Sequence, residues 1–116
     1  MAVSHAARAR IEQALAPVVP VRIKPMFGGA GIYAGDLFFA VIGSDEVLYL
    51  KADDGNRGLY AGAGAQQFMN MPYYSVPPHI FDDPGALAEW TVQALAAAER
   101  ARQAKPSRKR QTGANP

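Results

Sequence analysis

The stretch Met26–Lys51, MFGGAGIYAGDLFFAVIGSDEVLYLK, decides the fold of this 116-residue chain. Within it, glycine and aspartate turns separate three short apolar runs that are rich in β-branched and aromatic residues. Such spacing is typical of a tight antiparallel meander and not of a helix. The pair Gly35-Asp36 predicts a two-residue hairpin turn with a positive φ at Gly35. The strand that follows, 37–42, is apolar on both faces, so we expect it at the centre of the sheet.

Before this meander, the sequence predicts one helix and one weak strand. Ser4 has the chemistry of an N-cap, and apolar residues recur on one helical face as far as Val18. Pro17 and Pro20 end that pattern. The segment 21–26 is at best a minor edge strand, because Pro25 has no N–H to donate.

After the meander, we expect a short irregular helix around 59–61 that is capped by Asp53 or Asp54. The segments 66–71 and 73–76 predict a second hairpin, which Pro77-Pro78 terminates. A final helix begins with Asp83 as N-cap and Pro84 at the first position, and its apolar stripe contains Trp90.

Length and composition indicate one domain with one core. The chain has no cysteine, which excludes disulfides, thiolate zinc sites and cysteine nucleophiles. No signal-type apolar region and no apolar run of about 18 residues is present, so we expect a soluble cytoplasmic protein without membrane contact.

The charge is divided along the chain. Residues 1–99 carry six Lys and Arg against ten Asp and Glu, a net charge of −4, whereas residues 100–116 carry six basic and no acidic residues. The segment 105–116 has almost no apolar residue, which predicts a disordered tail after a domain over 1–104. The tail is a candidate nucleic-acid contact through Arg100, Arg102, Lys105, Arg108, Lys109 and Arg110.

No catalytic, cofactor or metal site is predicted. Gly28, Gly29 and Gly31 precede a strand and not a helix, so they are turn glycines and not a phosphate cradle. Ser75 and His79 lie on a proline-broken loop without the G-x-S-x-G motif of serine hydrolases. An enzyme or a small-molecule binder of unknown activity is the weakest alternative.

One segment is unusually rich in methionine and aromatic residues. Its side chains cannot all face one small core, and adaptable apolar surface of this kind suits a protein partner. The candidate partner surface consists of Met69, Met71, Tyr73, Tyr74, Val76 and Pro77.

The order of sequence blocks resembles the N-terminal domain of the TfoX/Sxy competence regulators of bacteria. The blocks are MFGG with GIY (26–33), LFFAVI (37–42), LYLK (48–51), MPYY with VP (71–77), and Trp90 with Ala94-Leu95. The resemblance covers about residues 8–104. It implies an α+β fold of the secretion-chaperone-like type, with helices on one antiparallel sheet in the order αβββαββα.

The same resemblance implies positive regulation of competence genes through contact with transcription machinery such as the cyclic-AMP receptor protein, and no catalysis. Full-length regulators carry a second, helical C-terminal domain, whereas this chain continues into its basic tail.

The apolar character of 37–42 on both faces also requires a cover for the second face of the sheet. Either the N-terminal helix crosses over to that face, or a homodimer forms with its two-fold axis there.

Overall fold

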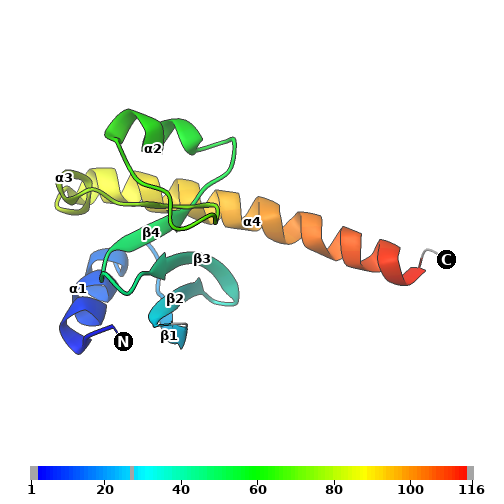
Figure 1. Ribbon diagram of the computed structural model, residues 1–116, viewed down its shortest axis with the longest axis horizontal. Coiled ribbons are helices and arrows are strands. Elements are labelled where there is room, and N and C mark those ends of the chain that lie inside the picture. Colours follow the sequence, from blue (N-terminus) through cyan, green and yellow to red (C-terminus); the bar gives the residue numbers. More distant parts are fainter. Residues whose placement is uncertain (1–2, 27, 115–116) are drawn as a thin grey trace.

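The computed structural model describes residues 3–26 and 28–114, with side chains through residue 104. The helices are α1 (His5–Leu15), α2 (Arg57–Ala63), α3 (Pro78–Phe81) and α4 (Pro84–Ala114), and the strands are β1 (Arg22–Met26), β2 (Gly29–Ala34), β3 (Leu37–Ile42), β4 (Leu48–Lys51) and β5 (Tyr73–Ser75). The five strands form one antiparallel sheet in sequential order, with β3 at its centre. This arrangement confirms the α+β prediction. Figure 1 shows α4 running past the sheet and projecting far beyond the body of the domain.

The meander folds as its turns predict. Gly35 has a φ of +63° in the tight turn between β2 and β3, where Ala34 pairs with Leu37. The next turn is closed by the hydrogen bond from Glu46 N to Gly43 O, at 2.8 Å. The strand β1 is stronger than expected, because all five of its residues pair with β2 in a continuous register.

A bulge in β3 changes which of its side chains enter the core. Ile32 pairs with Ala40 and Tyr33 pairs with Phe38, so Phe39 has no partner in β2. A bulge of this kind turns two successive side chains toward the same face. Phe39 and Ala40 are therefore both fully buried, whereas Phe38 points to the opposite face with Tyr33.

Two rows of directly paired residues define the core face of the sheet. One row is Ile32, Ala40 and Leu50; the other is Ala30, Ile42 and Leu48. These side chains form one cluster with Ile11 and Leu15 of α1 and with Leu87, Trp90, Ala94 and Ala98 of α4.

Both long helices thus cover the same face of the sheet. The prediction that the N-terminal helix crosses over to the second face is wrong, because α1 shares its core with α4. The second face, called the open face below, carries Lys24, Val41 and Tyr49 in one row and Arg22, Tyr33 and Phe38 in another.

The helix ends follow local chemistry, at two of the expected positions among others. Ser4 caps α1 by accepting a hydrogen bond from Ala7 N, and Asp83 caps the start of α4 by accepting from Gly85 N and Ala86 N. Gly64, with a φ of +72°, ends α2. The expected cap at Asp53 or Asp54 is wrong: α2 begins after Asn56, because the Asp53 carboxylate instead contacts Arg100 and Gly55 N.

Over 105–114, part of the segment for which composition predicts disorder, the backbone continues the last helix. In the structure, the backbone of α4 stays helical to Ala114. Lys, Arg, Gln and Ala are good helix formers, and a helix already nucleated by a packed face is extended at low cost.

Both edges of the sheet are blunted. At β1, Ile23 O accepts a hydrogen bond from Arg8 Nη2 at 3.3 Å, and Pro25 lacks an N–H. At β5, which has only three residues, Phe68 N donates to Tyr73 O and Ser75 N donates to Gln66 O. The expected second hairpin is therefore one short strand opposite an isolated bridge, Gln67 to Tyr74.

Candidate interaction surface

The loop between α2 and β5 displays two methionines. Met69 is 74% exposed and Met71 is 41% exposed. Met69 also has a φ of +53°, a backbone conformation that only a few per cent of non-glycine residues adopt. The loop therefore exposes the apolar side chain of Met69 to water, and the backbone conformation of that residue is itself unfavourable.

Backbone hydrogen bonds fix this loop in place. Phe68 N donates to Tyr73 O at 2.8 Å, and Met71 N donates to Phe68 O at 3.0 Å. The Gln67 side chain adds a bond from Nε2 to Met71 O, at 3.0 Å. The loop is tied to the sheet as well, because Ala52 N donates to Pro72 O at 2.8 Å. Hydrogen bonds within the loop and to the sheet thus support the backbone that carries the two methionines.

The other residues of the candidate partner surface lie elsewhere. Tyr73 and Val76 are buried, with only 4% and 6% of their surface exposed. Tyr74 stacks on Tyr60 at 5.1 Å between ring centroids, and Pro77 is half-buried before α3. The exposed part of the predicted surface is therefore the loop that carries Met69 and Met71, while Val76 belongs to the core and Tyr73 has almost no exposed surface.

The basic residues at the end of the body are engaged with acidic ones. Arg100 forms an ion pair with Asp53, and Arg102 forms ion pairs with Asp36 and Glu99. The side chains of Lys105, Arg108, Lys109 and Arg110 lie outside the described part of the structure. The structure therefore brings Arg100 and Arg102 onto the body and does not group them with a free tail.

The open face carries a row of aromatic rings with a cation at each end. Tyr33 stacks on Phe38 at 5.0 Å between centroids, and Phe38 lies 5.7 Å from Tyr73. Lys24 and Arg22 lie over the Tyr33 ring, and Lys51 lies over the Tyr73 ring. Burial, together with the nearby Tyr33, raises the pKa of Tyr73 to about 12.

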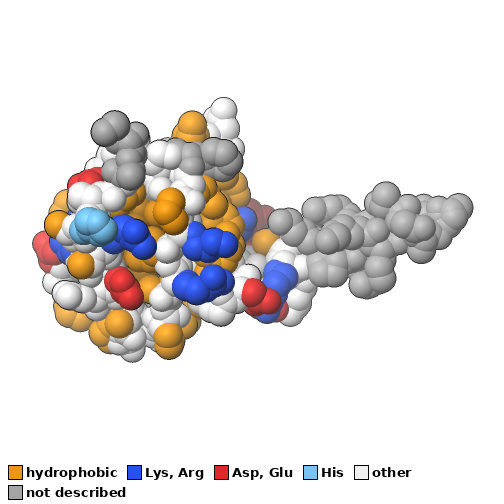
Figure 2. Space-filling model, turned by 90° about the horizontal axis from the view of Figure 1, so that it is seen from below, with side chains coloured by type: hydrophobic (Ala, Val, Ile, Leu, Met, Phe, Trp, Pro, Cys, Tyr) orange, Lys and Arg blue, Asp and Glu red, His pale blue; other side chains and the backbone are white. Residues whose placement is uncertain are grey.

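Most cations of the body lie on two elements. Four of the six Lys and Arg residues of the body lie on α1 and β1, namely Arg8, Arg10, Arg22 and Lys24. Figure 2, which views the molecule from the side of these two elements, shows Lys and Arg side chains gathered among exposed hydrophobic ones. Sequence counting missed this surface because the body as a whole is negative.

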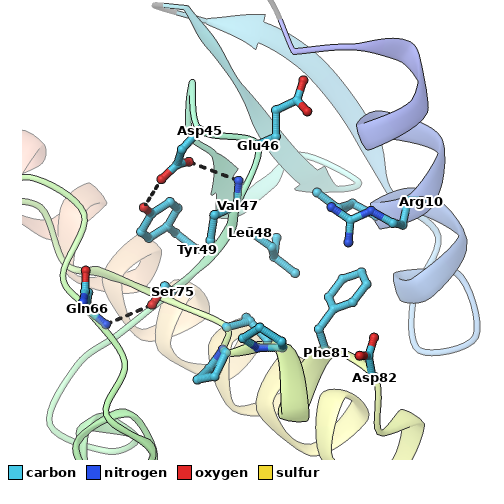
Figure 3. A pocket seen from close by; sticks show the side chains of 14 residues that line it. Arg10, Asp45, Glu46, Val47, Leu48, Tyr49, Gln66, Ser75, Phe81 and Asp82 are labelled. Carbon is cyan, nitrogen blue, oxygen red and sulfur yellow. Dashed lines mark hydrogen bonds between the residues drawn. The ribbon is translucent and has the colours of Figure 1, made fainter.

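A shallow cavity of about 450 Å³ lies between α1, α3 and the start of β4 (Figure 3). Arg10 lies over the Phe81 ring at 4.9 Å. Tyr49 donates to Asp45 at 2.7 Å. Ser4 N donates to Glu46, which lowers the pKa of that carboxyl. These polar groups satisfy one another and hold the loop before β4 in place.

The cavity has no arrangement for nucleophilic catalysis. Ser75 and Asp82 line it, but His79 does not. The Ser75 hydroxyl accepts a hydrogen bond from Gln66 N at 2.9 Å, and no histidine is among the lining residues. The described residues also contain no cluster of three or more potential metal ligands.

A second cavity, of about 360 Å³, opens at the end of the sheet, beside the methionine loop. Phe38 and Tyr73 line it from the sheet, Met71 and Pro72 from the loop, and Ala98 and Ala101 from α4. Asp36, Lys51 and Arg102 are the charged residues of the lining. Met71 is thus the methionine of the loop that lines this cavity, next to Phe38 and Tyr73 of the open face.

Comparison with known proteins adds one match. The family model described as the TfoX N-terminal domain matches residues 13–98, which include every strand and the first half of α4. No curated protein matches the chain at a significant level. Over the described residues, no helix has the length and apolar character needed to cross a membrane.

Proposed function

Because the matched model covers more than half of the chain, the protein belongs to the TfoX N-terminal domain family, and we propose that it is a non-enzymatic interaction module that regulates transcription or competence through protein contacts. The observation that carries this proposal is the exposure of Met69 and Met71 on a hydrogen-bonded loop. Such a role places the protein in the cytoplasm, where transcription machinery is found.

Exposed methionine suits this role for a physical reason. Its unbranched, polarizable side chain adapts to the shape of a partner, and burying it removes apolar surface from water. A preformed loop loses little conformational entropy on binding. The family is not a known enzyme family, which agrees with a module that binds and does not catalyse.

The test is photo-crosslinking in cell extract with the crosslinker at position 69, compared between the wild type and Met71→Lys. Val92, on α4, is the matched control site because it is 51% exposed and lines neither of the two cavities. We expect a discrete crosslinked partner at position 69 that Met71→Lys abolishes and that position 92 does not capture. Identical products from both positions would defeat the proposal.

A second candidate function is nucleic-acid binding through the tail. It is favoured by the charge: the last 17 residues carry six basic and no acidic residues. Since Arg100 and Arg102 are paired with acids of the body, the cations left for phosphate contacts are Lys105, Arg108, Lys109 and Arg110. Four such contacts predict a slope of log affinity against log salt of about −3 to −4.

Truncation after Gln103 tests this candidate, because it removes those four cations and keeps both ion pairs to the body. We expect the truncated protein to bind duplex DNA much more weakly than the wild type does. The wild-type affinity should follow the stated salt slope. An affinity that is independent of salt, or that survives the truncation, rules it out.

The protein could instead associate with a second copy of itself through the open face, since neither long helix covers that face. Sedimentation equilibrium at micromolar concentration decides between them. A dimeric mass that Phe38→Asp returns to the monomer would support the homodimer, and a strictly monomeric wild type would exclude it.

A further inference from the structure

We propose that Met69 is a site of reversible oxidation by peroxides, and that its sulfoxide releases the partner from the methionine loop while the domain stays folded. The methionine loop is the segment between α2 and β5 that carries Met69 and Met71. The consequence for the partner rests on the proposed function, whereas the oxidation itself does not. The inference adds a chemical class of reactant, a two-electron oxidant, and a means by which the interaction is regulated.

The oxidation of a methionine needs only access to its sulfur. A sulfur lone pair forms a bond to one peroxide oxygen while the O–O bond breaks and the other oxygen leaves as hydroxide. The new S–OH group then gives its proton to that hydroxide, so the products are a sulfoxide and water. Sulfur loses two electrons and the peroxide gains them. Because the protein supplies no base or metal in this reaction, the exposure of the sulfur decides which methionine reacts.

The three methionines in the described part of the chain differ in exposure. Met69 is 74% exposed, is not part of the core cluster, and lines none of the cavities described above. Met71 is 41% exposed and lines the cavity between the sheet and α4. Met26 is half-buried, and its sulfur lies over Gly31, where an added Cβ would come within 3.4 Å of it. Exposure therefore predicts that Met69 reacts first.

The protein has few other groups that compete for the oxidant. The sequence has no cysteine, whose thiolate is the side chain that peroxides commonly oxidise first. Trp90, the single tryptophan, is only 5% exposed and belongs to the core cluster. A peroxide that reaches this protein therefore meets methionine sulfur, and that of Met69 above all.

Oxidation of Met69 changes the surface of the loop and not its support. The hydrogen bonds of the loop, from Phe68 N to Tyr73 O and from Met71 N to Phe68 O, join backbone atoms that the oxidant leaves intact. The side chain, however, gains a polar S=O group in place of an apolar thioether. A partner pocket that encloses the thioether would bury this oxygen without a hydrogen bond, which is unfavourable. The sulfoxide should therefore weaken partner binding.

The same exposure makes the change reversible. Methionine sulfoxide reductases, one for each sulfoxide epimer, must reach the S=O group to return it to the thioether. Two thiols supply the two electrons and become a disulfide, and the oxygen leaves as water. A side chain that is 74% exposed on an outer loop is open to such an enzyme. Oxidation at Met69 is therefore a switch and not only damage.

Limited oxidation of the whole chain with hydrogen peroxide tests the site. Mass spectrometry with peptide fragmentation follows the sulfoxide at each methionine over time. We expect it to form at Met69 at least about twofold faster than at Met71 and about tenfold faster than at Met26, with the circular dichroism signal preserved. Formation at Met69 no faster than at the other two, or loss of the helical signal when only Met69 is oxidised, overturns the proposal.

Capture of the partner tests the consequence. A photo-crosslinker at position 70, which is exposed and adjoins both methionines, is used in dialysed cell extract on partly oxidised protein that has been freed of peroxide. We expect the captured molecules to contain at least about fivefold less Met69 sulfoxide than the uncaptured ones, and prior treatment with both reductases to restore capture. Met26→Leu is the matched control: it removes a sulfur away from the loop at similar side-chain volume, so the same depletion should persist.

The outcomes separate this proposal from the proposed function. Equal Met69 sulfoxide in captured and uncaptured molecules, capture that the reductases do not restore, or a depletion that vanishes in Met26→Leu overturns the regulation by Met69. Selective oxidation of Met69 in a protein that captures no partner overturns the proposed function, together with this consequence, and leaves the oxidation site standing. Capture of a partner by a protein that is oxidised without preference for Met69 overturns the oxidation site alone.

Discussion

Arg100 donates hydrogen bonds to both carboxylate oxygens of Asp53, a residue 47 positions earlier in the chain. The distances are 2.6 Å from Nε to Oδ2 and 2.8 Å from Nη2 to Oδ1. This paired geometry is the strongest arrangement that a guanidinium and a carboxylate form. It fastens the part of α4 that leaves the sheet to the loop after β4.

The first prediction concerns the pH dependence of this pair. The hydrogen bond from Arg100, assisted by the Gly55 N–H, lowers the pKa of Asp53 below its ordinary value. Because the pKa is lower in the folded state, the stabilisation is present above the unfolded value of about 3.9 and is lost as the pH falls through the folded pKa. The melting temperature of Arg100→Gln should therefore be lower than that of the wild type at pH 7 and equal to it at about pH 2.

Arg57→Gln is the control for this measurement, since both side chains of its ion pair with Asp54 are exposed and the pair should contribute little at any pH. A difference between wild type and Arg100→Gln that stays constant across the acid range would contradict the assignment.

The second prediction concerns Asn56, one of two polar residues that are buried in the part of the chain whose side chains are described. Its Oδ1 accepts from Asp53 N at 2.8 Å, and its Nδ2 donates to Lys51 O at 2.9 Å. Asn56→Ala leaves a buried donor without its partner, so we expect a loss of about 2 kcal/mol in the free energy of unfolding by urea denaturation. Gln67→Ala, which removes an exposed hydrogen bond, should change it by less than about 0.5 kcal/mol. Equal losses of unfolding free energy in the two variants would contradict the argument that burial makes the Asn56 hydrogen bonds more important than that of Gln67.

The third prediction compares two glycines. A Cβ on Gly29 would lie 2.2 Å from Ile42 O, whereas a Cβ on Gly58 in α2 would meet no atom within 4 Å. Gly29→Ala should destabilise the protein by about 2 kcal/mol or more, because the two strands must separate. Gly58→Ala should stabilise it by about 0.5–1 kcal/mol, because alanine loses less backbone entropy in a helix. The two midpoints of urea unfolding should thus move in opposite directions, and a shift in the same direction would refute the packing argument.

The fourth prediction concerns Tyr49. Burial, followed by the hydrogen bond to Asp45 and the charge of that carboxylate, raises the pKa of Tyr49 to about 12. Asp45→Asn should lower the pKa toward 10 without reaching it, since the burial remains. The unfolded state ionises first, so stability should fall as the pH rises from about 10 to 12, and less so in Asp45→Asn. Ring-selective NMR titration measures this pKa, and an unchanged value in the variant would remove Asp45 as a cause.

Much of the fold could be predicted because its signals are local. The Gly35 turn, the Ser4 cap and the Asp83-Pro84 helix start each depend on residues within a few positions of one another. The bulge at Phe39 could not be predicted, since alternation assumes an unbroken register and gives no sign of an extra residue. The helix α3 was missed for a similar reason: Pro78 at its first position was interpreted as a terminator, although proline is favoured there.

The candidate surface was only partly predictable. Composition singles out the segment 69–77 as a candidate, but the strand that buries Tyr73 is defined by pairing with Lys51, which is remote in sequence. The ion pairs of Arg100 and Arg102 likewise depend on where α4 passes the sheet. Side-chain exposure is a tertiary property, so residue type alone could not separate Met69 from Tyr73.

The blunted sheet edges have a consequence for behaviour at high concentration. Ordered fibrils grow when a new chain adds its backbone to an exposed strand. Here Arg8 occupies the Ile23 carbonyl, Pro25 has no N–H, and the loop 66–68 closes the other end of the sheet. Fibril growth from the native state has no template on either side, so concentrated solutions should stay free of thioflavin-positive material until the domain unfolds.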